Sequence, residues 1–311
     1  MITVIDLKSM RRIAPPRAAV LCLGNFDGIH LGHKRLIEET LERKRKLSAK
    51  REGIVSGAWF FETPPSEILA GKPVPQIMTL DEKIEKFAKL GLDCVYLADF
   101  AAMRTLPPAE FVEDVLKKEC NCIFAVCGFN YHFAHKGEGD ATALKTLMNG
   151  NAHIVDCFSV DGVAVSSSRI RSLLQEGDVS GASKLLGGEF SLSAPVLHGK
   201  KLGREMGIPT INQVFPHTAV IPKNGIYVTS TAIDGILYPS VSNIGVRPSV
   251  ERNGGVNCET HVIGFDGDLY GKTLTVSFKA RIRDEQTFPN LPALIDRIRQ
   301  DVEETKKYYG I

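Results

Sequence analysis

The chain has 311 residues, of which 43% are hydrophobic and 24% are charged, a composition typical of a globular protein with two domains. The formal net charge of +2 gives no reason to expect nucleic-acid binding, and no apolar run approaches the roughly 20 residues of a membrane span. The first residues lack a basic segment followed by an apolar one, so we expect no secretory signal.

Seven cysteines are an odd number, which argues against a set of disulfide bonds. Five of them lie in apolar runs: Cys22, Cys94, Cys122, Cys127 and Cys157. Free Cys is often buried, and a reducing cytosol keeps thiols free, so we predict buried thiols in a cytoplasmic protein. The Cys120–Cys122 pair could begin a metal site, but no matching second pair follows it.

The first half of the chain alternates apolar, strand-like runs with helical patterns. The runs are Ala18–Leu23, Ile54–Phe61, Cys94–Leu97, Cys122–Cys127 and Ile154–Phe158. Helical patterns begin at Thr79, which forms a capping box with Glu82, after Pro107–Pro108, and after Asp140. Continuously apolar strands alternating with helices predict a parallel sheet covered on both faces, with ligands at the carboxyl ends of the strands.

The stretch LGNFDGIHLGHKRL, residues 23–36, joins a predicted strand to a predicted helix through a turn that contains Gly24 and Gly28. A helix N-terminus presents unpaired N–H groups and a partial positive charge, which suit a phosphate. His30 and His33 are three residues apart and face one point, where two imidazoles can donate hydrogen bonds to a phosphoryl group. The stretch matches neither a Walker loop nor the dinucleotide fingerprint, and its alternative is an ordinary loop with two histidines.

Two further segments of the first half carry candidate binding residues. The long turn Gly128–Asp140 holds Asn130, which can donate and accept hydrogen bonds, and the aromatic residues Tyr131 and Phe133. A plain surface loop is the alternative. The segment Ser166–Arg171 looks like a helix start, at which serines are ordinary caps, while Arg171 can reach an anion at the same helix end.

After Gly187–Gly188 the pattern changes to short strands separated by turns, which predicts a small antiparallel barrel. The strands are Leu192–Leu197, Ile226–Ile233, Leu237–Ser242, Cys258–Phe265 and Lys272–Ala280. Asp234–Gly235 and Asp266–Gly267 are hairpin signals. A final helix should pack on the barrel through Leu291, Leu294, Ile295, Ile298 and Val302, which leaves Asp296, Arg299, Asp301 and Glu304 off this stripe.

The second half has its own candidate chemistry. Residues 199–207 combine glycines and cations in a loop able to fold over phosphates, although a basic hairpin loop is the alternative. Thr210 and Asn212 follow on one side of an extended segment, and their oxygens can hold Mg²⁺ against a triphosphate. Glu259 lies in a strand-like run, where it can take the proton of an attacking hydroxyl or can pair with an arginine such as Arg247.

Taken together, these motifs resemble those of the bacterial bifunctional enzymes that fuse a riboflavin kinase to an FMN adenylyltransferase. The first stretch is similar to the His-x-Gly-His signature of the nucleotidylyltransferase superfamily. The family's signatures stand here, in the family's order, as GNFDGIHLGH, GFNYHFAHKGEGD, SSSRIR, GREMGIPTIN, SNIGVRPSV and ETHVIGFDGDLYG. The resemblance covers nearly the whole chain.

The resemblance implies an α/β Rossmann-like nucleotidylyltransferase domain at residues 1–187 and an antiparallel barrel with riboflavin kinase activity and a C-terminal helix at residues 188–311. His30, His33 and Glu259 would be catalytic, and Thr210 and Asn212 would hold Mg²⁺. ATP or its phosphates would bind at Gly24, Asn25, Phe26, Gly28, Ser167, Arg171, Gly199, Gly203 and Arg204. The flavin would bind at Asn130, Tyr131, Phe133 and Arg247.

The resemblance further implies that ATP phosphorylates riboflavin to FMN, and that a second ATP adenylylates FMN to FAD with release of pyrophosphate, both with Mg²⁺. We expect small-molecule partners only, no nucleic acid or membrane, and a monomer or weak homo-oligomer. Departures from the family pattern at Phe60–Pro65, Ala134 and Ser168 all lie in the first half. A chain in which only the kinase half is active, or whose first domain uses another acceptor, is therefore an alternative, as is a non-enzymatic flavin sensor.

Overall fold

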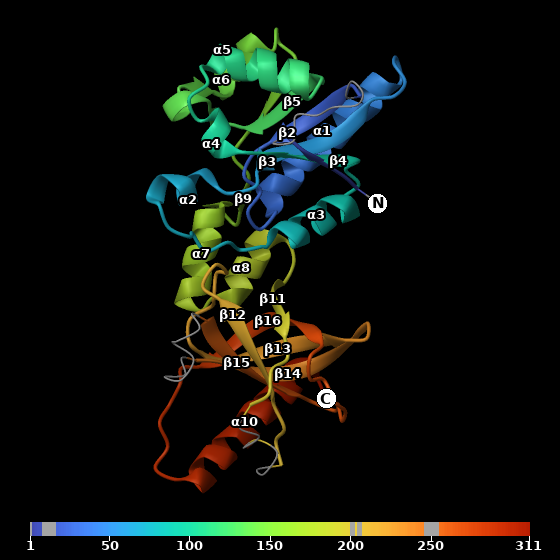
Figure 1. Cartoon of the computed structure of the whole chain (residues 1–311). Coiled ribbons are helices and arrows are strands. Elements are labelled where there is room, and N and C mark those ends of the chain that lie inside the picture. Colours follow the sequence, from blue (N-terminus) through green and yellow to red (C-terminus); the bar gives the residue numbers. More distant parts are fainter. Residues whose placement is uncertain (1, 8–16, 200–202, 204–206, 246–254) are drawn as a thin grey trace. The chain divides into compact units, whose positions relative to one another are not determined.

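The computed structural model describes residues 2–7, 17–199, 203, 207–245 and 255–311 (Figure 1). The chain forms two compact units, Met1–Ser166 and Ser167–Ile311, and each is described below by itself. Among the helices of the described ranges, none combines the length and the hydropathy that crossing a membrane requires.

The first unit is built on a six-stranded sheet in which every neighbouring pair of strands is parallel. In spatial order the strands are β1 (Thr3–Asp6), β4 (Cys94–Ala98), β3 (Val55–Phe61), β2 (Ala19–Leu23), β5 (Cys122–Gly128) and β8 (Ala152–Val155). The chain builds outward from β2 to β3 and β4, and then returns to place β5 and β8 on the other side of β2. The carboxyl ends of β2 and β5 therefore flank the topological switch point, where open α/β sheets bind ligands.

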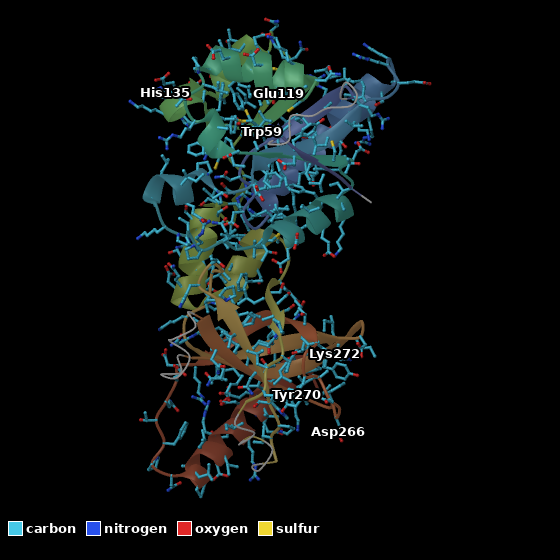
Figure 2. All side chains as sticks on the ribbon, in the orientation of Figure 1. Trp59, Glu119, His135, Asp266, Tyr270 and Lys272 are labelled. Atoms are coloured by element: carbon cyan, nitrogen blue, oxygen red, sulfur yellow. The ribbon has the colours of Figure 1, made fainter. Side chains whose placement is uncertain are left out.

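Helices cover both faces of this sheet, because each buried strand sends successive side chains to opposite faces. On one face, α1 (Leu31–Ser48) and α3 (Leu80–Lys89) enclose a core that contains Val20, Phe60 and Phe87. On the other face, the π-helix η1 (Phe111–Glu119) and α6 (Ala141–Leu147) enclose a core that contains Trp59, which Figure 2 labels. This arrangement confirms the predicted doubly covered parallel sheet.

The remaining elements of the first unit are short. They are α2 (Pro65–Ala70), α4 (Phe100–Met103), α5 (Pro108–Glu110), the 3₁₀-helix η2 (His135–Gly137) and the small hairpins β6 (His132–Phe133) with β7 (Gly139–Asp140) and β9 (Ser159–Val160) with β10 (Val163–Ala164). The last predicted strand is displaced, since β8 ends at Val155. Cys157 lies beyond that end and is exposed, so its predicted burial is wrong, whereas the other six cysteines are free and buried.

The second unit begins with α7 (Ser167–Glu176) and α8 (Val179–Leu186), followed by a six-stranded antiparallel sheet. Its spatial order is β11 (Phe190–Pro195), β16 (Thr273–Arg283), β13 (Gly225–Ile233), β14 (Ile236–Gly245), β15 (Gly255–Val262) and β12 (Ile211–Pro216). A bridge between Leu197 and Asn212 joins the two edges, so the sheet is a nearly closed barrel, as predicted.

One of the two predicted hairpins exists. Asp234 and Gly235, with φ of +49° and +84°, form the two-residue turn that joins β13 to β14. The hairpin prediction at Asp266–Gly267 is wrong, because β15 pairs with β14 and β12 and has no pairing with β16. The ten residues 263–272 instead connect two strands that lie apart in the barrel. The short strands β1 and β12 were not predicted as strands.

The C-terminal helix α10 (Leu291–Tyr309) packs on β13 and β14, as predicted, but its buried face differs from the prediction. Leu291 is exposed, whereas Asp301, expected off the buried stripe, is only 2% exposed. Its carboxylate accepts hydrogen bonds from Nε and Nη2 of Arg283 at 3.0 and 2.6 Å, and Arg297 lies 2.9 Å away. The inward face of the helix therefore includes an ion pair with β16 beside Leu294 and Ile298 of the predicted stripe.

We predict that Asp301→Ala lowers the free energy of unfolding by about 3–5 kcal/mol, because the Arg283 guanidinium would be left largely buried without its partner. Glu304→Ala is the matched control, since Glu304 also contacts Arg297 but is half exposed, and an exposed pair contributes about 1 kcal/mol or less. Urea unfolding followed by circular dichroism measures both changes. Equal effects of the two substitutions would contradict the buried ion pair.

Candidate active sites

The turn between β2 and α1 places His30 at the N-terminus of an 18-residue helix. Phe26, Gly28 and Ile29 all have positive φ, of +52°, +80° and +41°. Such a conformation is strained for the two non-glycine residues and persists only where the surroundings hold it, as at functional sites. The turn leads into a helix N-terminus, as the sequence predicted, and the binding of an anion there stays a prediction.

His30 is the N-cap of α1, and its Nδ1 accepts a hydrogen bond from the backbone N–H of His33 at 3.3 Å. The two imidazole rings stack, with centroids 3.6 Å apart and planes 12° apart, and Phe26 packs against His33. Since Nδ1 is an acceptor, a neutral His30 carries its proton on Nε2. The two imidazoles thus lie together as a stacked pair, and their donation to a common ligand stays a prediction.

Both imidazoles are held in the neutral form. Burial, together with the charge of Lys86, lowers the pKa of His30 to about 4. Burial also holds the pKa of His33 well below its usual range, with further contributions from His30, Lys83 and Lys86. At neutral pH the pair therefore provides N–H donors without adding positive charge of its own.

The positive charge near the histidines comes from α3, which the sequence analysis did not select. Lys86 donates a hydrogen bond from Nζ to the carbonyl oxygen of Gly28 at 3.3 Å, and Lys83 is only 5% exposed. Burial and the neighbouring Lys34 lower the pKa of Lys86 to about 8. The sequence contains one signal that could have identified Lys83: it lies four residues before Phe87 and so shares the inward face of the helix.

The flavin candidates of the first unit lie just after β5, the strand beside β2. Asn130 is exposed, two residues beyond the strand end. Phe133 is buried in the core beneath the loop, where its ring packs against Phe111, so it supports the loop from below. Tyr131 stacks on Phe133, and burial raises the pKa of its hydroxyl. The role of this loop in flavin binding stays a prediction.

Ser167 is the first residue of α7 and Arg171 lies one turn further along the helix. Both residues belong to the second unit. The predicted helix start is confirmed, and its contact with pyrophosphate stays a prediction. Two other candidates, Arg204 and Arg247, fall outside the described residues.

In the barrel, strand register aligns the polar candidates in one row. Glu259 on β15 lies directly opposite Asn212 on β12 and Asn243 on β14. The row continues through Ile226 on β13 to Arg283 on β16. Residues opposite one another in a sheet share a face, and all five line one cavity of about 310 Å³. The far wall of this cavity comes from α10, through Leu294, Ile298 and Asp301.

The surroundings of Glu259 leave its carboxylate facing this cavity. Asn257, two residues earlier on the same strand, donates a hydrogen bond from Nδ2 to Oε1 of Glu259 at 3.3 Å. His261 uses Nδ1 to hydrogen-bond the carbonyl oxygen of Pro209 at 2.8 Å, so it supports the chain next to Thr210. Sequence reasoning missed Asn243, because its place opposite Glu259 depends on pairing between β14 and β15.

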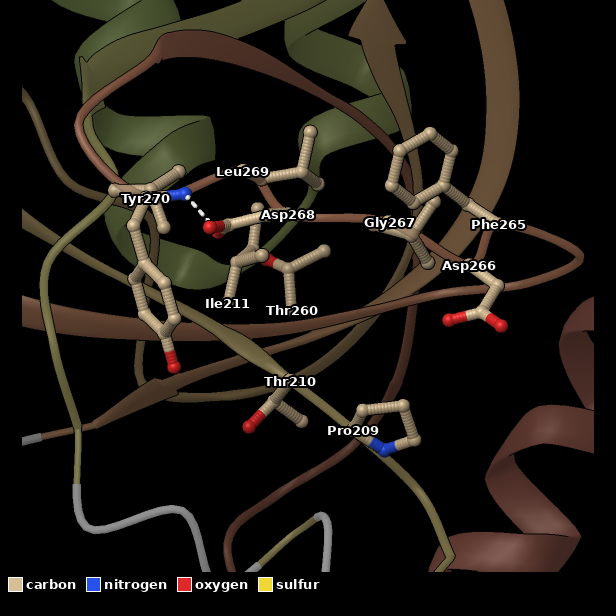
Figure 3. Close-up of a pocket in the computed structure, with 12 residues that line it drawn as sticks. Pro209, Thr210, Ile211, Thr260, Phe265, Asp266, Gly267, Asp268, Leu269 and Tyr270 are labelled. Carbon is tan, nitrogen blue, oxygen red and sulfur yellow. Dashed lines mark hydrogen bonds between the residues drawn. The ribbon is translucent and has the colours of Figure 1, made fainter.

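A second cavity, of about 530 Å³, lies beside the first and is shown in Figure 3. Tyr270 and Asp266 lie on opposite sides of it, and the backbone N–H of Tyr270 donates to Asp268 at 3.0 Å. Thr210 lines both cavities, whereas Ile211 lines only this larger one and Asn212 only the smaller. This is the alternation predicted for the segment, and it places a threonine hydroxyl at the junction of the two cavities.

The glycines before β12 lie against the two candidate metal ligands. A Cβ atom at Gly199 would collide with the side chain of Asn212, and one at Gly203 would collide with the carbonyl of Ile208 and approach Oγ1 of Thr210. Only glycine therefore fits where the loop passes these side chains. Among the described residues, no cluster of three His, Cys, Asp or Glu side chains could hold a metal alone. The neutral oxygens of Thr210 and Asn212 suit Mg²⁺ that is also bound by phosphates.

Comparison with known proteins covers both halves of the chain. A family model described as FAD synthetase matches residues 13–169, and one described as riboflavin kinase matches residues 186–309. A protein of Pseudomonas fluorescens named bifunctional riboflavin kinase/FMN adenylyltransferase is 35% identical over 92% of this chain and 91% of its own length. A protein of the same name from Escherichia coli K12 is 33% identical over 96% and 95%.

Solved structures agree on the fold. The crystal structure of a protein described as a macrolide-efflux protein from Streptococcus pneumoniae superposes with a TM-score of 0.87 and 30% sequence identity. The superposition covers 98% of this chain and 99% of that one.

We predict that the His30 ring keeps its proton on Nε2, with Nδ1 unprotonated, from pH 8 down to about pH 5. The reason is that its pKa of about 4 leaves the ring neutral in this range while Nδ1 accepts the His33 N–H. Long-range ¹H–¹⁵N spectra of the ring nitrogens report the tautomer, and loss of the signals in His30→Gln assigns them. A ring protonated on both nitrogens at pH 6 would show that the site does not hold a neutral imidazole.

Proposed function

The chain belongs to the family of bifunctional riboflavin kinase/FMN adenylyltransferases, and we propose that two catalytic domains, residues 1–187 and 188–311, divide the two steps of FAD synthesis between them. The protein makes FAD from riboflavin by way of FMN. We place the boundary between the catalytic domains at residues 187 and 188. One matched family model ends at residue 169 and the other begins at residue 186, within two residues of this boundary, whereas the two compact units meet at residues 166 and 167. The helices α7 and α8 thus belong to the second compact unit, although we assign them to the first catalytic domain.

In the proposed kinase step, ATP occupies the larger cavity and riboflavin the smaller one. The single observation that carries this assignment is Thr210, which lines both cavities and so lies where the two substrates would meet. Glu259 takes the proton of the terminal ribityl hydroxyl. The hydroxyl oxygen bonds to the γ-phosphorus of ATP, and the bond between the γ-phosphorus and the β–γ bridging oxygen breaks. Thr210 and Asn212 would hold Mg²⁺, which neutralises phosphate charge when bound.

In the proposed adenylyl transfer, a phosphate oxygen of FMN bonds to the α-phosphorus of ATP, and pyrophosphate leaves. His30 donates from Nε2 to an α-phosphate oxygen, and His33 stacks beside it as a second donor. The turn Gly24–Gly28 and the N-terminus of α1 hold the phosphates. Such transfer needs mainly positioning and stabilisation of developing charge, which preorganised N–H donors provide.

The proposal also covers the remaining binding residues, the metal ion, the location in the cell and the oligomeric state. Ser167 and Arg171 bind the leaving pyrophosphate, and Asn130 contacts FMN. Both steps use Mg²⁺, and the protein works in the cytoplasm as a monomer or weak homo-oligomer, with no nucleic-acid partner. Incubation with riboflavin, ATP and MgCl₂ followed by chromatography tests the whole proposal. FAD is the expected product, accumulation of FMN alone would leave only the kinase, and unchanged riboflavin would refute the kinase. FMN supplied in place of riboflavin tests adenylyl transfer by itself.

We predict that His30→Ala lowers the rate of FAD formation from FMN by roughly a hundred- to a thousandfold, because one preorganised donor to developing charge is lost. Riboflavin phosphorylation should be unchanged, since the kinase residues lie in the other unit. His153→Ala, at an exposed histidine on β8, is the control and should alter neither rate. Equal loss of both activities in a folded His30→Ala protein would contradict the assignment of separate sites.

Glu259→Gln retains the shape of the side chain but removes the proton acceptor. We predict that it lowers riboflavin phosphorylation by roughly a hundred- to ten-thousandfold, the usual contribution of a general base. Adenylylation of supplied FMN and the melting temperature, measured on the same preparation, should stay near their original values. Near-normal kinase turnover in the folded variant would remove Glu259 from the mechanism, and a lowered melting temperature with normal turnover would make it structural.

A further inference from the structure

The turn that carries His30 is held by one contiguous stretch of the first unit, the segment before α3 together with α3 itself. Phe26 packs its ring edge-to-face on Phe87 with centroids 5.2 Å apart. Asp27 accepts a hydrogen bond from the backbone N–H of Ile77 at 2.9 Å. Gly28 accepts the hydrogen bond from Lys86. Three consecutive residues of the turn are thus each bound by residues 77–87.

These contacts hold a turn whose backbone conformation is energetically unfavourable. A non-glycine residue in a sparsely populated φ/ψ region costs about 1–3 kcal/mol, and the turn contains two such residues, Phe26 and Ile29. The helix that restrains them is itself well fixed, because Thr79 and Glu82 form a complete capping box at its start and Phe87 is fully buried. A rigid helix can hold a strained turn that would otherwise relax.

We propose that Lys86 is a positioning residue for adenylyl transfer, which fixes the strained turn through the carbonyl of Gly28 and places a positive charge beside the His30–His33 pair. The inference rests on the function proposed for the first unit. Lys86 acts through the turn and the imidazoles, and the reacting groups remain those assigned above. His30 follows Gly28 by two residues, so a shift of this carbonyl displaces the ring that caps α1.

The electrostatic part of the proposal follows from the charges around the two rings. Lys83 and Lys86 of α3 act on the rings, and Asp27 lies within the turn. Lys34 of α1 lowers the pKa of Lys86, while Glu82 raises it. Among the residues that the structure describes, Lys86 is the one cation that lowers the pKa of both His30 and His33. Its removal should raise both pKa values, so the rings would gain protons at a higher pH.

The chain offers a matched control on the same helix. Lys89 lies three residues after Lys86, is 75% exposed, and pairs with Glu85 at 3.3 Å. Lys86→Met removes the charge and the donor while keeping an unbranched side chain of high helix propensity, and Lys86→Arg keeps both the charge and donor groups. Lys89→Met makes the same chemical change at a position that touches neither the turn nor the histidines.

The test measures FMN adenylylation and riboflavin phosphorylation on the full chain from pH 9 down to the lowest pH at which the protein stays folded, together with the ¹⁵N titration of the His30 ring, whose pKa of about 4 requires that range. For Lys86→Met we expect kcat for adenylylation to fall about ten- to a hundredfold, as a small misplacement of reacting groups can produce, with KM changing less. The acid limb of its pH profile and the His30 titration should both move to higher pH. Lys86→Arg should recover most of the rate, and Lys89→Met should behave as the unaltered protein.

Several results would overturn the proposal. An unaltered kcat and an unmoved His30 titration in Lys86→Met would do so, as would the same loss in Lys89→Met. Equal loss in Lys86→Met and Lys86→Arg would show that the packing of the side chain matters and its charge does not. If the unaltered protein phosphorylates riboflavin but does not adenylylate FMN, the proposed function of the first unit fails and the role of Lys86 fails with it. Normal FAD synthesis by both the unaltered protein and Lys86→Met rejects the role of Lys86 alone.

Discussion

Asn212, Glu259 and Asn243 lie opposite one another on β12, β15 and β14, and the site in the barrel depends on this register. Side chains alternate between the two faces of a strand, so a slip of one residue in β15 would turn Glu259 out of the cavity. The same alternation places Ile211 toward the larger cavity and Asn212 toward the smaller one. Thr210 lies at the junction of the two cavities, where it is positioned by β12, the strand that follows it, and by Gly203, which lies against it.

In the first unit, the neutral imidazoles of His30 and His33 present N–H groups that carry no positive charge. The His30 Nδ1 is occupied by the His33 N–H, so only Nε2 is left to carry a proton toward a phosphate. This arrangement requires strained positive φ angles at Phe26 and Ile29, and α3 holds the turn in this conformation. In the proposed mechanism the two roles are therefore separate, because the neutral imidazoles would donate hydrogen bonds while lysines would provide the positive charge.

Much of this organisation is readable from the sequence, because it is carried by local patterns. The apolar runs identify the central strands, the capping box at Thr79 identifies α3, and the strand–turn–helix stretch identifies the His30–His33 pair. The features that were missed depend on contacts between distant segments. Asn243 becomes a site residue only through the register of β14 with β15, and Asp301 is buried only because Arg283 lies opposite it. Asp266–Gly267 looks like a hairpin locally, but strand order in the barrel separates β15 from β16.

We expect FMN made on one unit to be adenylylated by chemistry that belongs to the other. Mixing the His30→Ala and Glu259→Gln proteins with riboflavin, ATP and MgCl₂ tests it directly, because each variant lacks one step and retains the other. We predict that the mixture forms FAD, although neither protein alone does so at a comparable rate. A mixture that forms no FAD, while each variant still performs its own remaining step on supplied substrate, would contradict the account of two separable sites.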